Sequence, residues 1–580
     1  MNKMYQKKVK KRTIILASFS LLWLLVVAMR LVQLQVIDHA RLKKTVLEQN
    51  RLINTISPKR GTLYDRQGNI LARSIPSLSV YYVPDKDEPF AEQSKKAQKL
   101  GPILKLSARD LRSITQRIKH NSSFIWIKRK ISGELTEKVK ALQLGGVNFL
   151  EENKRFYPHG RLASFILGRV NIDEEGQSGI ELKHNSLLSG KPGKRLILRD
   201  AKQREYHFEI LEAAEPGIDL ILTIDETIQY IAEKELRRAV EEKGARWGLV
   251  IISEPSTGEI LGMAHEPSFD LNHLTSDPQR LDRIPAVHYT FDPGSTFKIV
   301  TFASAIESKS IDFSEEFDCS PGVIPVAGKQ FRDHKKLGIL TFPEVIIHSS
   351  NVGTIQIGQR LGERTLYNTI KSFGFGQRTG IDLPAEETGI FRPIKSWSRL
   401  SLASLSIGYE ISVTAIQMLQ AINTVANKGM AVAPRILKRV LISPSEQEPP
   451  QSKRVISEDT AQKLCLFLEK VVERGTGTEA RIAGYRVIGK TGTAQKFDTA
   501  SGTYSSSAHI ASFMGFVCTE NPVFSMVVVI DDPHGPYYGG QVAAPLFRRI
   551  ASRVLQYLRL SPQEPSPETI IASQLRRIQE

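Results

Sequence analysis

The stretch FDPGSTFKIV, residues 291–300, places a serine, Ser295, three residues before a lysine, Lys298. A Pro-Gly pair directly before Ser295 interrupts the preceding structure. Apolar residues then recur with the spacing of one buried helical face: Ile299, Phe302, Ala303 and Ile306. We therefore expect a helix that begins at or just before Ser295. Residues three apart lie on the same helical face, so the Ser295 hydroxyl and the Lys298 amine can meet.

This pair has the elements of a nucleophile and its base. A serine at a helix start lies near free backbone N–H groups and the positive end of the helix dipole, and both favour developing negative charge. One S-x-x-K pattern is weak evidence, because most such pairs lie on solvated helix faces. This is the only S-x-x-K in the chain, and two further motifs strengthen the interpretation.

Two later segments carry the polar residues that would complete a site. HSSNVG, residues 348–353, contains Ser349 and Asn351. IGKTGTAQK, residues 488–496, contains a lysine followed by small and hydroxyl residues: Lys490, Thr491, Gly492 and Thr493. The lack of bulky side chains predicts that this second segment is an edge strand. Each motif alone is weak, but the order S-x-x-K, S-x-N, K-T-G within one domain is highly specific.

Length and composition indicate an ordinary globular chain with two large domains. The 580 residues are 41% hydrophobic and 24% charged, with a formal net charge of +18. Six lysines and arginines lie in residues 1–12 without an acidic residue, which leaves +12 for the other 568. We expect this remainder to be spread over a diffuse basic surface, and nucleic acid is a poor candidate partner. The three cysteines are far apart and predict neither a disulfide framework nor a metal site.

The N-terminus has the pattern of an uncleaved signal anchor. Residues 13–29 contain no charge and follow the basic run of residues 1–12. The segment is long enough to span a membrane, exceeds the usual apolar core of a signal peptide, and precedes no A-x-A-like cleavage site. We expect a single membrane span over residues 13–35, with residues 1–12 in the cytoplasm and the rest of the chain outside the membrane.

Beyond the anchor, the sequence predicts two domains. Residues 36–215 contain strand-like pieces and turn-rich motifs without a recognisable active site, and are best interpreted as a pedestal. Glu215, Pro216 and Gly217 mark a boundary. Residues 216–560 have strands at both ends and helices between them, which predicts an α+β domain whose sheet is completed by its N- and C-terminal segments. Residues 561–580 are proline-containing and are expected to form a loosely attached tail.

The motif set resembles that of the serine penicillin-recognising enzymes. Together with RGTLYDRQGNILA (residues 60–72), RFYPHG (155–160) and YYGGQVAAPLF (537–547), the chain resembles a class B penicillin-binding protein over nearly its whole length. The resemblance implies a single transmembrane helix, an elongated, mostly β, dimerisation-type pedestal, and a transpeptidase domain of the penicillin-binding and serine β-lactamase type, with an antiparallel sheet and flanking helices. It also implies a D,D-transpeptidase that cross-links peptidoglycan stem peptides.

The resemblance implies roles for the motif residues. Ser295 would attack the carbonyl of the penultimate D-Ala, and Lys298 would take its proton. Ser349 would relay a proton to the leaving amine, and Asn351 would orient Lys298 and a substrate amide. Oxyanion donors would be the backbone N–H groups of Ser295 and Thr493.

The K-T-G segment would bind the substrate. Lys490, Thr491 and Thr493 would hold the terminal carboxylate of the donor peptide, and Gly492 would let the peptide lie along the strand. Lys298 must also lose its proton near neutral pH, although an unperturbed lysine has a pKa of about 10.4. We expect burial and the like charge of Lys490 to lower the pKa of Lys298.

The SSN sequence of residues 349–351, rather than SSD, resembles the division (septal) branch of the class, with the elongation branch as the alternative. The implied partners are peptidoglycan stem peptides, β-lactams as covalent inhibitors, a membrane glycosyltransferase and other division proteins, with no cofactor. A β-lactamase would need a deacylation base such as an E-x-x-L-N element, which the chain lacks. A β-lactam sensor would usually have several membrane spans. The implied location is the cytoplasmic (inner) membrane, with the catalytic domain on its periplasmic side.

Overall fold

The structure is a computed structural model, and it describes residues 2–42, 51–85, 87–120, 122, 124–199, 205–274, 282–441, 451–498 and 502–562. The chain divides into two compact units, Met1–Lys59 with Gly190–Pro216 and Arg60–Ser189 with Gly217–Glu580. Most of the expected C-terminal tail, residues 563–580, lies outside the described residues. The boundary expected near residue 216 remains a prediction.

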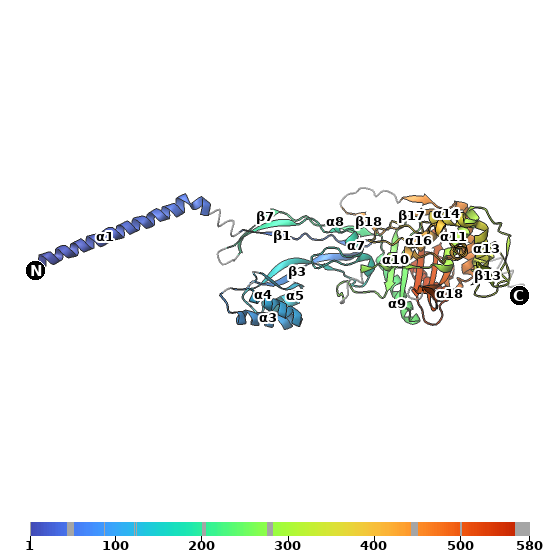
Figure 1. Cartoon of the computed structure of the whole chain (residues 1–580), viewed down its shortest axis with the longest axis horizontal. Coiled ribbons are helices and arrows are strands. Elements are labelled where there is room, and N and C mark those ends of the chain that lie inside the picture. The colour runs from blue at the N-terminus through green and yellow to red at the C-terminus, as the bar shows by residue number, and fades with distance from the viewer. Residues whose placement is uncertain are drawn as a thin grey trace. The chain divides into compact units, whose positions relative to one another are not determined.

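The first unit contains the anchor helix and a small sheet. Helix α1 (Asn2–Val32) continues into a π-helical turn, η1 (Gln33–Ile37), and Lys3–Ile37 is long and apolar enough to cross a membrane (Figure 1). The expected span, residues 13–35, lies within it. Strands β1 (Arg51–Ile56), β6 (Gly193–Arg199) and β7 (Glu205–Glu212) form an antiparallel sheet in the order β1-β6-β7.

A mixed sheet in the second unit connects segments from both sides of residue 216. Its strands are β2 (Leu63–Tyr64), β3 (Ile70–Tyr82), β4 (Ile125–Ile131), β5 (Val147–Phe156), β8 (Leu220–Leu222) and β18 (Leu437–Val440). The order is β18-β8-β2-β3-β4, and β5 also pairs with β3. The antiparallel pair β2 and β3 confirms the hairpin character of the RGTLYDRQGNILA motif.

Three helices add to the strands expected in the N-terminal part of this unit. Helices α3 (Phe90–Leu104), α4 (Ala108–Lys119) and α5 (Gly133–Lys140) pack with β3 and β4 around a separate hydrophobic cluster. Helix α4 begins with a capping box between Ser107 and Asp110, and it buries Ile114 and Ile118, four residues apart. Local capping and a narrow apolar stripe therefore explain this helix.

The part of the second unit that carries the three motifs is built on a five-stranded antiparallel sheet, which confirms the expected α+β fold. The strands are β9 (Trp247–Ser253), β10 (Ile260–Glu266), β20 (Arg486–Asp498), β21 (Thr503–Cys518) and β22 (Pro522–Asp531), in the order β10-β9-β22-β21-β20. The central pairing of β9 with β22 joins the N- and C-terminal segments of the domain, as expected. Strand β20, with the K-T-G motif, lies at the edge of the sheet, which confirms that this segment is an edge strand.

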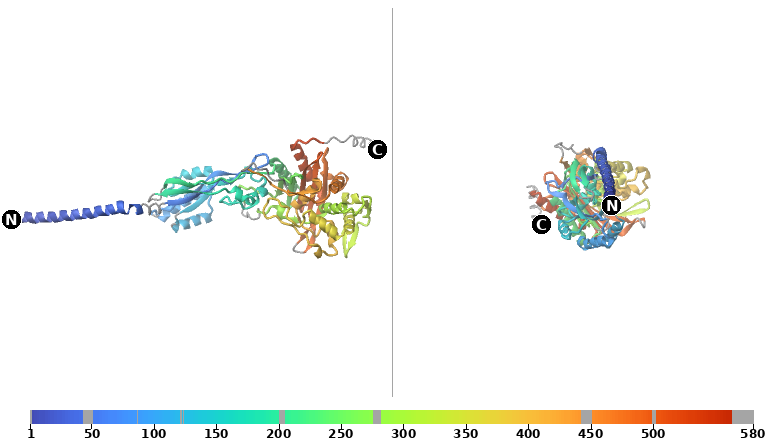
Figure 2. Two further views of the ribbon diagram at one scale, coloured as in Figure 1. Left: turned by 90° about the horizontal axis from the view of Figure 1, so that it is seen from above. Right: turned by 90° about the vertical axis from the view of Figure 1, so that its left-hand side faces the viewer.

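Both faces of this sheet are covered by helices. On one face, Val250, Ile252 and Val528 pack against α9 (Glu226–Lys243) and α18 (Gly539–Tyr557). On the other, Ile251 and Val527 belong to the larger cluster around α11 (Lys298–Glu307) and α16 (Ala415–Ala426). Alternate residues of one strand thus face opposite layers. Figure 2 shows α18, in red, beside the orange and red strands of the sheet.

Helix α11 lies at the centre of a helical layer. Every residue from Lys298 to Ile306 is buried. Its neighbours are α12 (Phe342–Ile347), α13 (Asn351–Leu361), α14 (Glu363–Ser372), α15 (Ser401–Ser406) and α17 (Glu458–Arg474). The S-x-N motif lies where α12 meets α13: Ser349 is in the connection and Asn351 is the first residue of α13.

Candidate active site

The candidate nucleophile lies on a tight turn before the central helix. Ser295 belongs to a 3-10 turn, η3 (Gly294–Phe297), and the α-helix itself begins at Lys298. The helix therefore begins slightly later than expected. Gly294 has a φ of +53°, and a Cβ there would lie 3.1 Å from the carbonyl oxygen of Thr493. A glycine at this position lets the turn approach strand β20 closely.

Lys298 is completely buried, and its amine contacts the S-x-N motif. Its Nζ lies 2.7 Å from Asn351 Oδ1, 2.7 Å from the Ser349 carbonyl oxygen and 3.4 Å from Ser349 Oγ. The partly exposed Ser295 hydroxyl has no hydrogen bond to any residue that the structure describes. The expected contact between Ser295 and Lys298 is thus not formed here, because Asn351 and Ser349 hold the amine.

Ser349 bridges the two buried lysines. Its Oγ accepts a hydrogen bond of 2.8 Å from Lys490 Nζ, in addition to the contact with Lys298. Its backbone has a φ of +57°. This left-handed conformation costs about 1–2 kcal/mol for a residue with a Cβ, and such strain is concentrated at functional sites. The hydroxyl is therefore placed where a proton can pass between two amines.

Burial changes the proton affinity of both lysines. It lowers the pKa of Lys298 to about 7, while the negative charge of Asp333 acts in the opposite direction. The pKa of Lys490 lies well below its ordinary value because of burial, with a further contribution from the charge of Lys298. The lowering by burial agrees with the expectation. The like-charge effect between the two lysines acts on Lys490, and the expected effect of Lys490 on Lys298 remains a prediction.

Strand β20 runs directly alongside the nucleophile turn. A Cβ on Gly492 would lie 2.8 Å from Thr296 Cγ2 and 3.1 Å from the Pro293 carbonyl oxygen. Any larger residue would push the strand away from the turn. The same Cβ would also collide with Ser512 Oγ on β21, so Gly492 is required by close packing against both the turn and the neighbouring strand. Room for a substrate along the strand remains a prediction. The backbones of Ser295 and Thr493, the expected oxyanion donors, lie on these two adjacent segments.

The two threonines of the K-T-G-T segment are anchored by the loops around them. The hydroxyls of Thr491 and Thr476 are 2.6 Å apart, and Thr491 is buried. Thr493 Oγ1 accepts a hydrogen bond of 2.9 Å from the backbone N–H of Gly539, at the start of α18, and remains partly exposed. Thr493 is therefore the more accessible of the two for a ligand.

Asp333 is a site residue that the motifs do not reveal. It follows β14 (Lys329–Arg332). Its Oδ2 accepts a hydrogen bond of 2.7 Å from Ser350 Oγ, and its Oδ1 accepts from the backbone N–H of Asn351 and, at 3.1 Å, of Val352. Asp333 thus caps the helix that carries the S-x-N motif. Its charge also favours the protonated form of Lys298.

Asp292 is a second addition, although it lies within the quoted stretch. Tyr504 on β21 donates a hydrogen bond of 2.6 Å to Asp292 Oδ2. Burial raises the pKa of Asp292 to about 6, against the effect of this hydrogen bond. The contact connects the nucleophile turn to the sheet. A carboxylate three residues before Ser295 was visible in the sequence, but its partner more than 200 residues away was not.

The described residues contain no group of three His, Cys, Asp or Glu side chains placed to hold a metal ion. The site brings together the Ser295 hydroxyl, two buried amines of lowered pKa, and the bridging Ser349.

Comparison with known proteins gives a consistent result. A family model described as penicillin binding protein transpeptidase domain matches residues 248–552, and one described as penicillin-binding protein dimerisation domain matches residues 55–222. Stage V sporulation protein D of Bacillus subtilis is 34% identical over 96% of this chain and 87% of its own length. Peptidoglycan D,D-transpeptidase FtsI of Escherichia coli is 30% identical over 92% of this chain and 89% of its own.

A similar solved structure agrees with these matches. Penicillin binding protein 3 of Mycobacterium tuberculosis, complexed with aztreonam, is 28% identical, covers 88% of this chain and 98% of its own, and has a TM-score of 0.67.

Proposed function

The chain belongs to the penicillin-binding protein transpeptidases, and from this premise we propose that it cross-links peptidoglycan through an acyl-enzyme on Ser295. The observation that carries the proposal is the buried Lys298 amine, held by Ser349 and Asn351 beside the Ser295 turn and linked through Ser349 to Lys490. The relative FtsI of Escherichia coli, which is named a peptidoglycan D,D-transpeptidase, matches 92% of this chain. We also propose the domain limits stated above, with the anchor at residues 13–35 and the transpeptidase domain at 216–560.

The first half-reaction forms the acyl-enzyme. Ser295 Oγ attacks the carbonyl carbon of the penultimate D-Ala of a donor stem peptide while its proton passes to neutral Lys298. The negative charge on the carbonyl oxygen is stabilised by the N–H groups of Ser295 and Thr493. The bond to the terminal D-Ala nitrogen then breaks. This nitrogen receives a proton through Ser349, whose hydroxyl lies within reach of both lysine amines.

The second half-reaction transfers the acyl group. The amine of a second stem peptide attacks the ester carbon, its proton returns through Lys298, and Ser295 is released as the new amide bond forms. Water attack would give hydrolysis instead. A β-lactam enters by the same first step, and its opened ring remains attached to Ser295.

The donor carboxylate has a proposed site on strand β20. Lys490, Thr491 and Thr493 would hold it, with Thr493 the most accessible of the three. Burial keeps the pKa of Lys490 low in the empty site. An arriving carboxylate would raise that pKa, since an opposite charge favours the ammonium form. Substrate binding would therefore favour the charged form of Lys490.

The reaction itself can be tested with purified protein in detergent. Peptidoglycan precursor strands with pentapeptide stems serve as donor and acceptor, and both free D-Ala and cross-linked peptide dimers are quantified. We expect both products in equal amounts. Release of D-Ala with hydrolysed stems and no dimers would contradict the transfer step while leaving acylation intact.

We further propose a septal role and the inner membrane as location, with residues 1–12 in the cytoplasm. The SSN motif and the similarity to FtsI support the first, and the basic N-terminus supports the second. A membrane glycosyltransferase and other division proteins would be partners, because no glycan polymerase was recognised in the sequence. Depletion in cells should give undivided filaments, whereas rounded cells would favour the elongation alternative.

The pH dependence of acylation follows from Lys298. Only the neutral amine accepts a proton, and burial lowers the pKa of Lys298 to about 7. The rate of covalent reaction with penicillin should therefore be constant above about pH 8 and fall about tenfold per pH unit below about pH 6. Stopped-time labelling between pH 5 and 9 measures this. A rate that still rises tenfold per unit at pH 9 would indicate an unshifted lysine.

Asp333 should set the midpoint of this profile. Its carboxylate raises the pKa of Lys298, so Asp333→Asn should move the midpoint to lower pH. A control is Asp225→Asn, because Asp225 caps α9 through the N–H groups of Thr227 and Ile228. An unchanged midpoint in Asp333→Asn, or equal shifts in both variants, would show that Asp333 acts only as a helix cap.

A further inference from the structure

Outside the basic run of residues 1–12, most of the chain's net positive charge lies in one segment. Residues 90–140, the basic lobe, contain 13 lysines and arginines but only four acidic residues, a net charge of +9 out of the chain's +18. The lobe comprises α3, α4, β4 and α5. The diffuse basic surface expected from composition is therefore wrong: half of the net charge belongs to 51 residues that contain none of the transpeptidase motifs.

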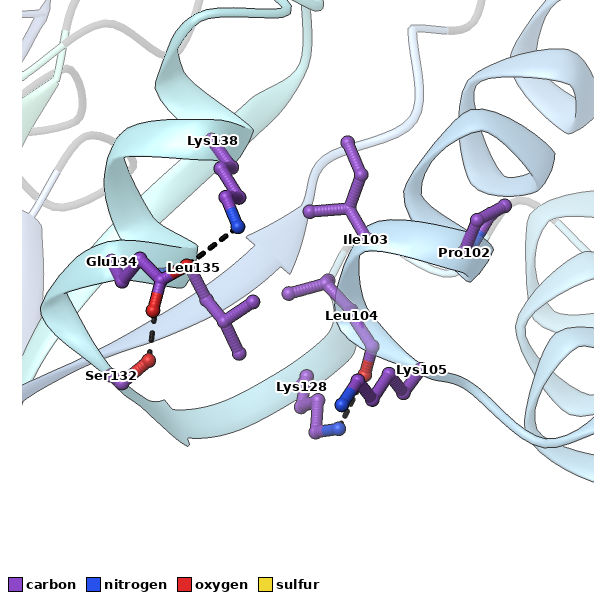
Figure 3. Close-up of a pocket in the computed structure, with 9 residues that line it drawn as sticks. All are labelled: Pro102, Ile103, Leu104, Lys105, Lys128, Ser132, Glu134, Leu135 and Lys138. Atoms are coloured by element: carbon purple, nitrogen blue, oxygen red, sulfur yellow. Dashed lines mark hydrogen bonds and ion pairs between the residues drawn. The ribbon is translucent and has the colours of Figure 1, made fainter.

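The basic lobe contains a pocket of about 570 Å³ (Figure 3). It lies between the C-terminal end of α3, strand β4 and the start of α5, and is lined by Pro102, Ile103, Leu104, Lys105, Lys128, Ser132, Glu134, Leu135 and Lys138. Figure 3 shows Ile103, Leu104 and Leu135 at the pocket; Leu104 is completely buried, whereas Ile103 and Leu135 remain partly exposed and form its apolar wall. Its volume lies in the range of ligand-binding clefts, about 300–1,000 Å³.

The pocket combines an apolar wall with a positive rim. Lysines outnumber the single glutamate by three to one. Lys128 donates to the carbonyl oxygen of Leu104, which fixes one ammonium at the pocket. Lys138 pairs with Glu134 at 2.6 Å, but both side chains are more than half exposed, and such pairs contribute only about 0–1 kcal/mol. An incoming carboxylate can replace Glu134. Lys105 is exposed and has no ion pair with any described residue.

We propose that this pocket docks an acidic segment of a partner protein, with an apolar side chain against Ile103 and Leu135 and carboxylates on Lys105, Lys128 and Lys138. The charge of the basic lobe selects an acidic partner and attracts it over distance. The apolar wall distinguishes such a segment from a purely polar polyanion, which has no group to place there. Docking at this site is separate from the transpeptidase chemistry of Ser295.

The test measures binding of synthetic peptides to the full-length protein in detergent. The probe is a fluorescein-labelled 12-residue peptide that alternates Asp and Glu around two central Leu residues. Its controls are the same peptide with Ala for Leu, poly-aspartate, and vesicles of phosphatidylglycerol. Lys105→Glu/Lys138→Glu reverses the rim charge, and Lys99→Glu/Arg112→Glu makes the same change in net charge at exposed positions of the lobe outside the pocket.

We expect the Leu peptide to bind the wild-type protein. Its affinity should fall at least about tenfold for Lys105→Glu/Lys138→Glu and less than about threefold for the control, Lys99→Glu/Arg112→Glu. The Ala peptide should bind at least about fivefold more weakly than the Leu peptide. No binding at millimolar peptide, equal loss in both variants, or preference for poly-aspartate or vesicles would overturn the proposal. Penicillin labelling of Ser295 should be unchanged in both variants, which shows that they are folded.

Discussion

Replacement of Ser295 by alanine should abolish covalent labelling of the chain by penicillin. In the proposed mechanism Ser295 supplies the oxygen that becomes the ester, and no neighbouring hydroxyl occupies its place on the η3 turn. In a serine protease, removing the nucleophile alone lowers the rate about as much as removing all three catalytic residues, about 10⁶-fold. We expect at least a thousandfold loss, the limit of most gel assays. The measurement is the rate of labelling by a fluorescent penicillin.

A matched control separates loss of the nucleophile from general damage. Ser308→Ala makes the same change at an exposed position directly after α11. It should label at the wild-type rate. Thermal unfolding of both variants should stay close to the wild type, because Ser295 has no hydrogen bond to a described residue. Labelling of Ser295→Ala at more than about 1% of the wild-type rate would show that another residue is the nucleophile.

Lys298→Met should cause the second-largest loss. Methionine fills a similar buried volume without an amine, so the Ser295 proton loses its acceptor. General-base contributions of this kind are about 10²- to 10⁴-fold. The variant also leaves Asn351 Oδ1 and the Ser349 carbonyl oxygen without their 2.7 Å donor. We expect a loss of at least about a hundredfold in the rate of penicillin acylation, measured at pH 8.

The same variant provides a check on the identity of the base. If Lys298 is the titrating group, Lys298→Met should also lose the fall in rate below pH 7. Lys309→Met, at an exposed position two residues after α11, is the control and should retain the wild-type rate and pH profile. A loss of less than about tenfold, or a preserved midpoint near pH 7, would assign the base to a different group.

The sequence was sufficient for the parts of the molecule that local patterns determine. The uncharged run of residues 13–29 marked the span, the small residues of the K-T-G motif marked an edge strand, and the pattern of strands and helices gave the α+β class. The motif order brought Ser295, Ser349 and Lys490 into one domain. Lys490 and Lys298 do meet at Ser349, as that order implies.

Features that depend on long-range packing were not visible. The pKa of Lys298 is set by complete burial, which a helical stripe suggests but does not measure. The carboxylate of Asp333 acts on α13 through contacts that no motif encodes. The sequence predicts strands and turns for residues 36–215 but not the helices α3, α4 and α5, because their short amphipathic stripes are stabilised by packing against β3 and β4. The excess of lysine and arginine in residues 90–140 is visible in the sequence, but the net charge of the whole chain does not show where that excess lies.

Direct identification of the acylated residue tests the nucleophile assignment most sharply. Full-length protein in detergent is incubated with penicillin, digested with a protease and analysed by tandem mass spectrometry. We predict one penicilloyl group per chain, located on Ser295 within the peptide that contains FDPGSTFK. A penicilloyl group on any other residue, or none on protein that is folded and otherwise intact, would contradict the assignment.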